Sequence, residues 1–112
     1  MKKVLIIDDN IDILRVLKKQ LKGYDVKCYT KMIPMEFVAQ YDLVILDRKL
    51  KNKDGLEIAC EIRAILPEQK IIMITGFVDL FEGNLEGPFD KILIKPISKK
   101  LLINSIEEVC DG

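Results

Sequence analysis

The chain has 112 residues, of which 49% are hydrophobic and 32% are charged. This length allows one domain of ordinary size, and this mixture of apolar and charged residues excludes a disordered tail. Basic and acidic side chains are equal in number, so no overall charge favours nucleic acid or an anionic membrane as a partner. The absence of histidine excludes Ser-His-Asp and Cys-His catalysis and histidine-rich metal sites.

Four short runs of the sequence are continuously apolar and are bounded by polar or charged residues. They lie at 4–7, 43–46, 71–74 and 92–94. Continuous apolarity predicts strands that are covered on both faces, as in a parallel sheet between layers of helices. A weaker run at 26–29 predicts an edge strand.

Amphipathic stretches separate these runs and predict helices. The expected helices lie at 11–22, 34–40, 56–66, 77–89 and 102–110. Gly23 and Pro67 stand where the first and third of them should end, and Ser98 is a predicted cap for the last. Glycines and a proline interrupt the fourth stretch, so we expect that helix to be short.

Strands and helices alternate along the chain, and right-handed crossovers then place helices on both faces of a parallel sheet. We therefore predict a three-layer α/β sandwich with five parallel strands. No linker, internal repeat or low-complexity tract divides the sequence, so the expected domain spans 1–112 and includes no output domain.

The three cysteines, Cys28, Cys60 and Cys110, are widely spaced and contain no Cys-x-x-Cys pair. We interpret them as reduced thiols that fill the core of a cytoplasmic protein. The apolar run at 4–7 follows two lysines and ends before Asp8, so it is too short for a secretion signal. No other apolar run is long enough to cross a bilayer. Neither a membrane nor nucleic acid is therefore an expected direct partner.

Chemically useful side chains follow the predicted strands at their carboxyl ends, where open α/β sheets bind ligands. Asp8 and Asp9 follow the strand at 4–7, and Asp47 follows the strand at 43–46. Thr75 and Lys95 end two later strands. Three neighbouring carboxylates would repel one another unless a cation held them, and oxygen ligands without histidine favour Mg²⁺. The lysine and the hydroxyl indicate an anion as well, for which phosphate fits best.

Taken together, these motifs resemble the receiver domain of two-component response regulators, of the chemotaxis-receiver type. The resemblance covers the whole chain and is carried, in order, by Val4 to Asn10, Asp42 to Asp47, Asp54 and Gly55, Ile72 to Thr75, and Ile94 to Ile97. Each motif alone is weak, but five in order at the ends of the expected strands are specific. The family implies the flavodoxin-like strand order 2-1-3-4-5.

The resemblance implies that Asp47 accepts a phosphoryl group from a phosphohistidine on a partner protein, or from a small acyl phosphate. Asp9, Asp47 and the backbone carbonyl of Lys49 would bind Mg²⁺, or Mn²⁺ in its place, with Asp8 acting mostly through water. Such a domain is not a turnover enzyme on other substrates. It would catalyse only its own phosphorylation and dephosphorylation.

The family also implies roles for residues around the acceptor. Lys95 would pair with one phosphoryl oxygen, and Thr75 would donate a hydrogen bond to another. Asp54 and Gly55 would form a turn that shapes the loop beside the site. Pro96 would follow a cis peptide bond that orients the lysine.

Some positions depart from the family pattern. Ile92 stands three residues before Lys95, where the family usually has an aromatic residue, so the usual aromatic rotamer switch is absent. Lys51 and Gly76 replace the usual Pro and Ala, which indicates looser loops. We hypothesise that the ammonium of Lys49, two residues after the predicted acceptor, slows hydrolysis of the phosphoaspartate.

Simpler interpretations exist for the single residues and for the function. Asp8 and Asp9 could cap the helix at 11–22, Asp47 could merely end a strand, and Lys95 could be a solvated lysine before a turn. The alternative function is a receiver-like module that binds a protein without phosphorylation. A turnover phosphatase is a third possibility, although the sequence shows no second general acid or base for it.

The expected phosphodonor partner is a histidine kinase or a phosphotransfer protein. The signal would pass to a downstream protein, or to a second copy of the chain, through a face that changes on phosphorylation. This face would combine the helix within 77–89, the strand at 92–94 and the helix at 102–110.

Overall fold

The computed structural model describes residues 1–51, 53–76 and 87–111. The strands are β1 (Lys3–Ile7), β2 (Asp25–Tyr29), β3 (Leu43–Asp47), β4 (Lys70–Thr75) and β5 (Lys91–Ile94). The helices are α1 (Ile11–Gln20), α2 (Met35–Val38), α3 (Gly55–Ile65) and α5 (Lys99–Asp111). All five predicted strands are confirmed, each to within one residue at either end.

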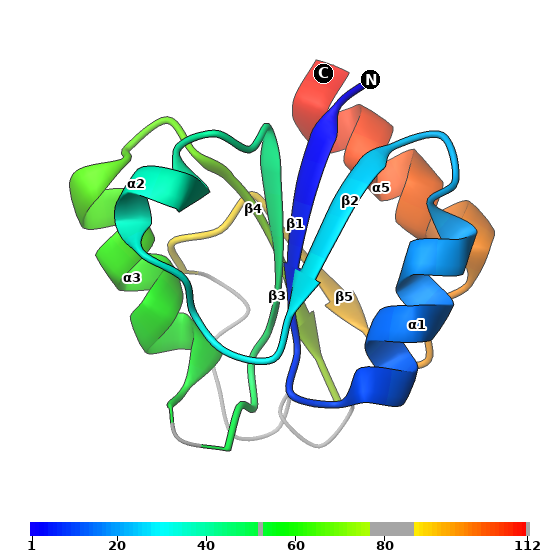
Figure 1. Ribbon diagram of the computed structural model, residues 1–112, viewed down its shortest axis with the longest axis horizontal. Helices are drawn as coiled ribbons and strands as arrows, with labels where there is room; N and C mark the ends of the chain where they lie inside the picture. The colour runs from blue at the N-terminus through cyan, green and yellow to red at the C-terminus, as the bar shows by residue number, and fades with distance from the viewer. Residues whose placement is uncertain (52, 77–86, 112) are drawn as a thin grey trace.

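The strands form one parallel sheet in the order β2-β1-β3-β4-β5, which confirms the predicted flavodoxin-like order. The chain passes from β1 outward to β2 and then crosses back to β3, so the strand order reverses between β1 and β3. All the carboxyl ends lie at the lower edge of Figure 1, and both termini lie at the opposite edge. Lys2 and Asp111 form an ion pair of 3.1 Å there.

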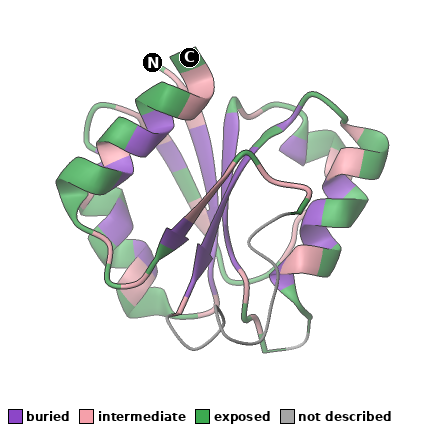
Figure 2. Cartoon of the chain, turned by 180° about the vertical axis from the view of Figure 1, so that it is seen from behind, coloured by how far each residue is buried: buried purple, intermediate pink, exposed green. Residues whose placement is uncertain are grey.

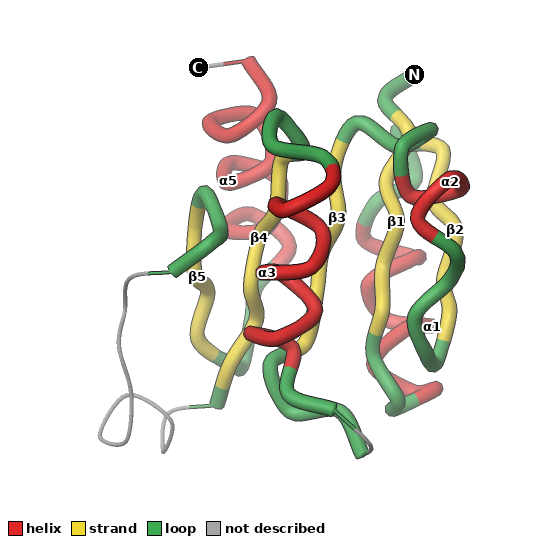
Figure 3. Tube along the Cα trace, turned by 90° about the vertical axis from the view of Figure 1, so that its left-hand side faces the viewer, coloured by secondary structure: helices red, strands yellow, loops and turns green. Residues whose placement is uncertain are grey.

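Helices cover both faces of the sheet, with α1 and α5 on one face and α2 and α3 on the other (Figure 3). Alternate residues of a strand supply the two cores, because successive side chains point to opposite faces. In β1, Val4 and Ile6 pack with α1 and α5, whereas Leu5 and Ile7 pack with α2 and α3. Figure 2 shows the resulting concentration of buried residues in the strands. This two-sided burial explains the continuous apolar runs.

The helix ends follow local signals. Asn10 caps α1, since its side-chain oxygen accepts hydrogen bonds from the backbone N of Asp12 (2.9 Å) and of Ile13 (3.3 Å). The predicted cap at Ser98 is confirmed, because its Oγ accepts from the backbone N of Leu101 (3.1 Å). The first helix ends two residues earlier than predicted, and α2 is a single turn of four residues.

The segment that leads into β5 is held at the amino-terminal edge of the sheet. Asp90 accepts hydrogen bonds from the backbone N of Ile71 (2.8 Å) and from Nη2 of Arg63 (2.6 Å). The helix predicted within 77–89 falls mainly on 77–86, which lie outside the described residues. None of the described helices is long and apolar enough to span a membrane.

Candidate functional site

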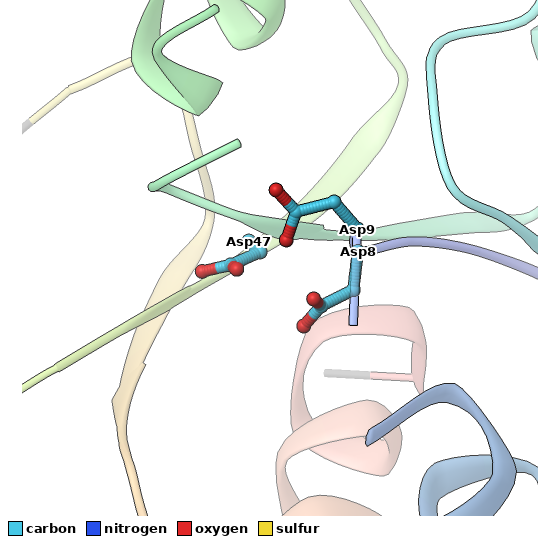
Figure 4. A group of neighbouring side chains, drawn as sticks. All are labelled: Asp8, Asp9 and Asp47. Carbon is cyan, nitrogen blue, oxygen red and sulfur yellow. The ribbon is translucent and has the colours of Figure 1, made fainter. Parts of the chain in front are cut away.

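Three aspartates meet at the carboxyl edge of the sheet, beside the reversal in strand order. Asp8 and Asp9 directly follow β1, and Asp47 is the last residue of β3. The two strands are paired, with Ile7 opposite Leu46, so the residues that follow are brought together. One carboxylate oxygen from each aspartate lies within 4.8 Å of the other two (Figure 4). We refer to these three residues as the acidic cluster.

Asp8 is the most enclosed member of the cluster, with a side chain only 2% exposed. Its Oδ1 accepts a hydrogen bond from the backbone N of Asn10 (2.9 Å), and its backbone N donates to the carbonyl of Tyr29 (3.1 Å). Oδ2 has no hydrogen-bond partner among the described residues and lies 4.0 Å from Nζ of Lys95. Because Asn10 caps α1, the alternative that Asp8 or Asp9 caps this helix is wrong.

Asp9 and Asp47 are each held by the loop that follows β3. Oδ2 of Asp9 accepts a hydrogen bond from the backbone N of Lys51 (2.8 Å). Oδ1 of Asp47 accepts a long one from the backbone N of Lys49 (3.4 Å) and lies 3.4 Å from Nζ of Lys95. The side chain of Asp47 is 7% exposed, and this remaining exposure leaves a route for a reactant to reach it.

Lys95 directly follows β5, and its side chain extends past the end of β4 to the acidic cluster at the ends of β3 and β1. Its backbone N donates to the carbonyl of Thr75 (2.8 Å), which extends the pairing of β4 with β5 by one residue. Thr75 is buried at the end of β4. The peptide bond between Lys95 and Pro96 is cis, as the family resemblance implies. The structure therefore places Thr75, Lys95 and the three aspartates at one edge of the sheet.

Asp54 and Gly55 begin α3 rather than form a separate turn. Oδ1 of Asp54 accepts a hydrogen bond from the backbone N of Leu56 (2.9 Å) and caps the helix. The backbone N of Gly55 donates to the carbonyl of Arg48 (2.6 Å). A Cβ on Gly55 would clash with the backbone oxygen of Asp47 and would lie 2.8 Å from Cα of Arg48. Only glycine lets α3 start this close to the end of β3.

Sequence reasoning missed two residues that organise the site. Asn10 belongs to the first motif of the sequence, and an Asn directly before a helical stretch is a standard signal for a cap. The hydrogen bond from Lys51 to Asp9 carried no signal in the sequence, because it uses a backbone N–H that every residue but proline has. The family's usual proline at this position would lack that donor.

Burying these carboxylates close together disfavours their ionised forms and raises the pKa of two of them. Burial, and next the nearby charge of Asp8, raise the pKa of Asp47 to about 6, although Lys95 acts in the opposite direction. Burial also raises the pKa of Asp8, against the hydrogen bond that it accepts from Asn10. A divalent cation would offset both penalties. The all-oxygen donor set and the unbonded Oδ2 of Asp8 fit Mg²⁺.

Comparison with known proteins agrees with this geometry. Residues 4–107 match the family described as response regulator receiver domain. The chain belongs to this receiver domain family. Receiver domains act in two-component signalling, where they interact with histidine kinases or phosphotransfer proteins and with downstream effectors. They are in general not turnover enzymes.

This receiver domain is 32% identical to the response regulator receiver protein CpdR of Brucella abortus (strain 2308), over 97% of each chain. A solved receiver domain protein from Clostridium thermocellum is similar, with a TM-score of 0.86 and 28% identity over 99% of this chain and 95% of that one. A CheY-like receiver domain protein from Methanospirillum hungatei JF-1 has a TM-score of 0.82 and 28% identity, over 99% and 94% of the two chains.

Proposed function

We propose that this receiver domain accepts a phosphoryl group on Asp47, in a Mg²⁺-dependent step of a phosphorelay. The observation that carries the proposal is the position of the Asp47 carboxylate, which is nearly buried between two further carboxylates and the ammonium of Lys95. Clustered buried carboxylates destabilise a fold unless they bind something. A function that uses a cation and an anion together accounts for all of these groups.

The proposed reaction is a phosphoryl transfer between a donor and the carboxylate. One oxygen of Asp47 attacks the phosphorus, and a new P–O bond forms as the bond to the leaving imidazole nitrogen or acyl oxygen breaks. The leaving group keeps the electron pair. Lys95 pairs with a phosphoryl oxygen, and the hydroxyl of Thr75 donates a hydrogen bond to another. The same side chains would act in reverse order when water hydrolyses the phosphoaspartate.

We propose that Asp8, Asp9 and Asp47 would hold Mg²⁺, with the backbone carbonyl of Lys49 as a further ligand. Mg²⁺ bound there would offset the repulsion between these carboxylates and the incoming phosphoryl oxygens. Mn²⁺ prefers similar oxygen ligands and would serve in its place. This chain's own contribution is a set of oxygens that backbone hydrogen bonds hold in position before the ion arrives.

The proposed partners rest on the residue composition of the chain and on the exposed surface of β5 and α5. These 112 residues contain no histidine, so a phosphohistidine donor lies outside them, and we propose a histidine kinase or a phosphotransfer protein. We propose that output uses the face of β5 and α5, where Ile94 (38%) and Leu101 (41%) are exposed. A downstream protein or a second copy of the chain would bind there. We also propose that the protein acts in the cytoplasm, where its cysteines stay reduced.

The second candidate function is a protein-binding module that works without phosphorylation. The observation in its favour is Ile92, which stands where the family's usual aromatic switch would be and packs, partly buried, against the core on the α2 and α3 side. This residue cannot perform an aromatic rotamer change. Such a module would not need the acidic cluster or Lys95, so their retention favours the phosphoacceptor function.

Incubation with acetyl phosphate or beryllofluoride, followed by intact mass measurement and amide spectra, tests the proposal. We expect an adduct that forms in the presence of Mg²⁺ and does not form when EDTA is present from the start. Asp47→Asn should abolish it, whereas Asp12→Asn, which changes an exposed carboxylate on α1, should not. Absence of any adduct and of any Mg²⁺-dependent spectral change in the unmodified protein would favour the second candidate.

A further inference from the structure

We propose that a pocket beside the acidic cluster binds a small organic anion with an apolar body. This pocket has a volume of about 570 Å³, which lies in the range of small-molecule sites. Its lining comes from the residues just after β2, from described residues between β3 and α3, and from the first part of α3. These segments lie at the carboxyl edge of the sheet (Figure 1). This volume suits a small molecule rather than a macromolecule.

The buried and partly buried part of the pocket lining, called the floor below, is apolar apart from Asp9. Met32, Leu50 and Ile58 line it, and all three pack in the core between the sheet and the helices α2 and α3. Ile58 is buried, and the other two are partly buried. Because core packing holds these side chains, the apolar surface exists before any ligand binds. Displacing water from it favours a ligand that carries a short hydrocarbon chain.

The exposed part of the pocket lining, called the rim below, contains three lysines. Lys31, Lys51 and Lys53 line it, and Lys53 forms an ion pair with Glu61. The ammonium groups of Lys31 and Lys51 are not within ion-pair distance of any carboxylate in the part of the chain that the structure describes. Two exposed cations above an apolar floor recognise an anion whose charged end lies at the rim. A carboxylate or a phosphate would meet this requirement.

Asp9 connects this pocket to the acidic cluster. Its side chain belongs to both, and its Oδ2 accepts the hydrogen bond from the backbone N of Lys51. In the metal-free protein this carboxylate repels an anion in the pocket. A cation bound to Asp9 would offset that repulsion, so Mg²⁺ and the anion should each raise the affinity for the other by the same factor. This coupling rests on the proposed function, whereas the pocket itself does not.

Titration with sodium hexanoate, followed by the amide NMR spectrum, tests the pocket. We expect saturable shifts at Lys31, Leu50 and Lys51, with an affinity that increases when Mg²⁺ is present. Hexan-1-ol lacks the charge and acetate lacks the apolar chain, so both should bind more weakly. The double variant Lys31→Gln with Lys51→Gln should weaken hexanoate binding about fivefold, the size expected for two exposed ion pairs.

A matched double variant, Lys19→Gln with Lys22→Gln, removes the same charge from α1 and from the residues just after it, outside the pocket, and should bind hexanoate normally. Absence of saturable shifts, or equal shifts with hexan-1-ol, would overturn the pocket even if Asp47 is phosphorylated normally. Hexanoate binding that is independent of Mg²⁺ would support the pocket and count against the proposed metal site. The two proposals can therefore fail separately.

Discussion

The degree of burial of each acidic residue determines how readily its carboxyl group ionises and what can reach it. Asp8 and Asp47 are almost enclosed, and this burial raises the pKa of both carboxyl groups. The side chain of Lys95 is one-third exposed, so it is accessible to an anion from solvent. The half-buried Asp9 faces both the acidic cluster and the inferred pocket. Each residue type was evident from the sequence, but its exposure was not.

Asp47→Asn should stabilise the metal-free protein near neutral pH and have little effect in acid. Folding raises the pKa of Asp47 from 3.8 to about 6, so the folded state binds the proton more tightly than the unfolded chain. Stability therefore falls as the pH rises from about 4 through 6, and the variant escapes this loss. We expect a gain on the order of 2 kcal/mol near pH 7.5, from urea unfolding in EDTA. An equal gain near pH 4 would contradict the assigned cause.

Lys49→Ala should shorten the lifetime of the phosphoaspartate. The backbone N of Lys49 lies 3.4 Å from Oδ1 of Asp47, so its exposed side chain starts beside the acceptor carboxylate. We expect hydrolysis to accelerate about threefold, the scale of one exposed electrostatic contact. Decay of the phosphorylated protein after removal of the donor measures the effect. Lys53→Ala is the control in the same loop, and an unchanged lifetime in Lys49→Ala would disprove the hypothesis.

At the scale of elements, the connections after β1 and β3 build the site together. Asn10 caps α1 and also donates its backbone N–H to Asp8, so the start of this helix fixes a carboxylate. Asp54 caps α3 in the same way and lies 3.8 Å from Nε of Arg48, the residue after β3. The beginnings of two helices thus hold the loops that carry the acidic cluster.

Gly55→Ala should destabilise the protein and disturb the site, because its Cβ would overlap the backbone at the end of β3. We expect a loss of about 2 kcal/mol in the free energy of unfolding, as for other overpacked positions. Gly23→Ala is the matched control, since a Cβ there meets no atom within 4 Å. Urea unfolding compares the two variants. Equal stability of both would show that α3 can shift away from β3 without loss.

At the scale of the whole molecule, the strand order creates the site. β1 and β3 are neighbours although α1, β2 and α2 separate them in sequence, and β5 joins the sheet through β4. The carboxyl ends of these strands therefore converge, and they bring Asp8, Asp47 and Lys95 within ion-pair distance. This convergence concentrates negative charge at one edge of a chain whose formal net charge is zero.

Mg²⁺ should raise the melting temperature of the whole domain. An ion that binds only the folded state at ten times its Kd adds about 1.4 kcal/mol of stability, which is about 5 °C for a domain of this size. Thermal unfolding near neutral pH, at constant ionic strength, measures the shift. Asp47→Asn should reduce it, and Asp12→Asn should preserve it. Equal melting temperatures without divalent ions and with Mg²⁺, Mn²⁺ or Ca²⁺ would argue against a cation site in the cluster.

The sequence alone determined the five strands, the burial of β1, β3 and β4 on both faces, and the residue types at the carboxyl ends of β1, β3, β4 and β5. Apolar runs carry this information because burial acts on each residue locally. Helix limits were less well determined, since α1 ends before Leu21 and α2 keeps only one turn. Competing local hydrogen bonds, rather than apolar periodicity, decide where a helix ends.

Only the tertiary structure decided which groups act together. It placed Lys95 3.4 Å from Asp47, put Gly55 against the end of β3, and opened a pocket between two loops beside Asp9. Each of these results depends on the packing of segments that are distant in the sequence. The spacing of apolar residues indicates which side of a helix or strand is buried, but it does not indicate which side chain of another element packs against it.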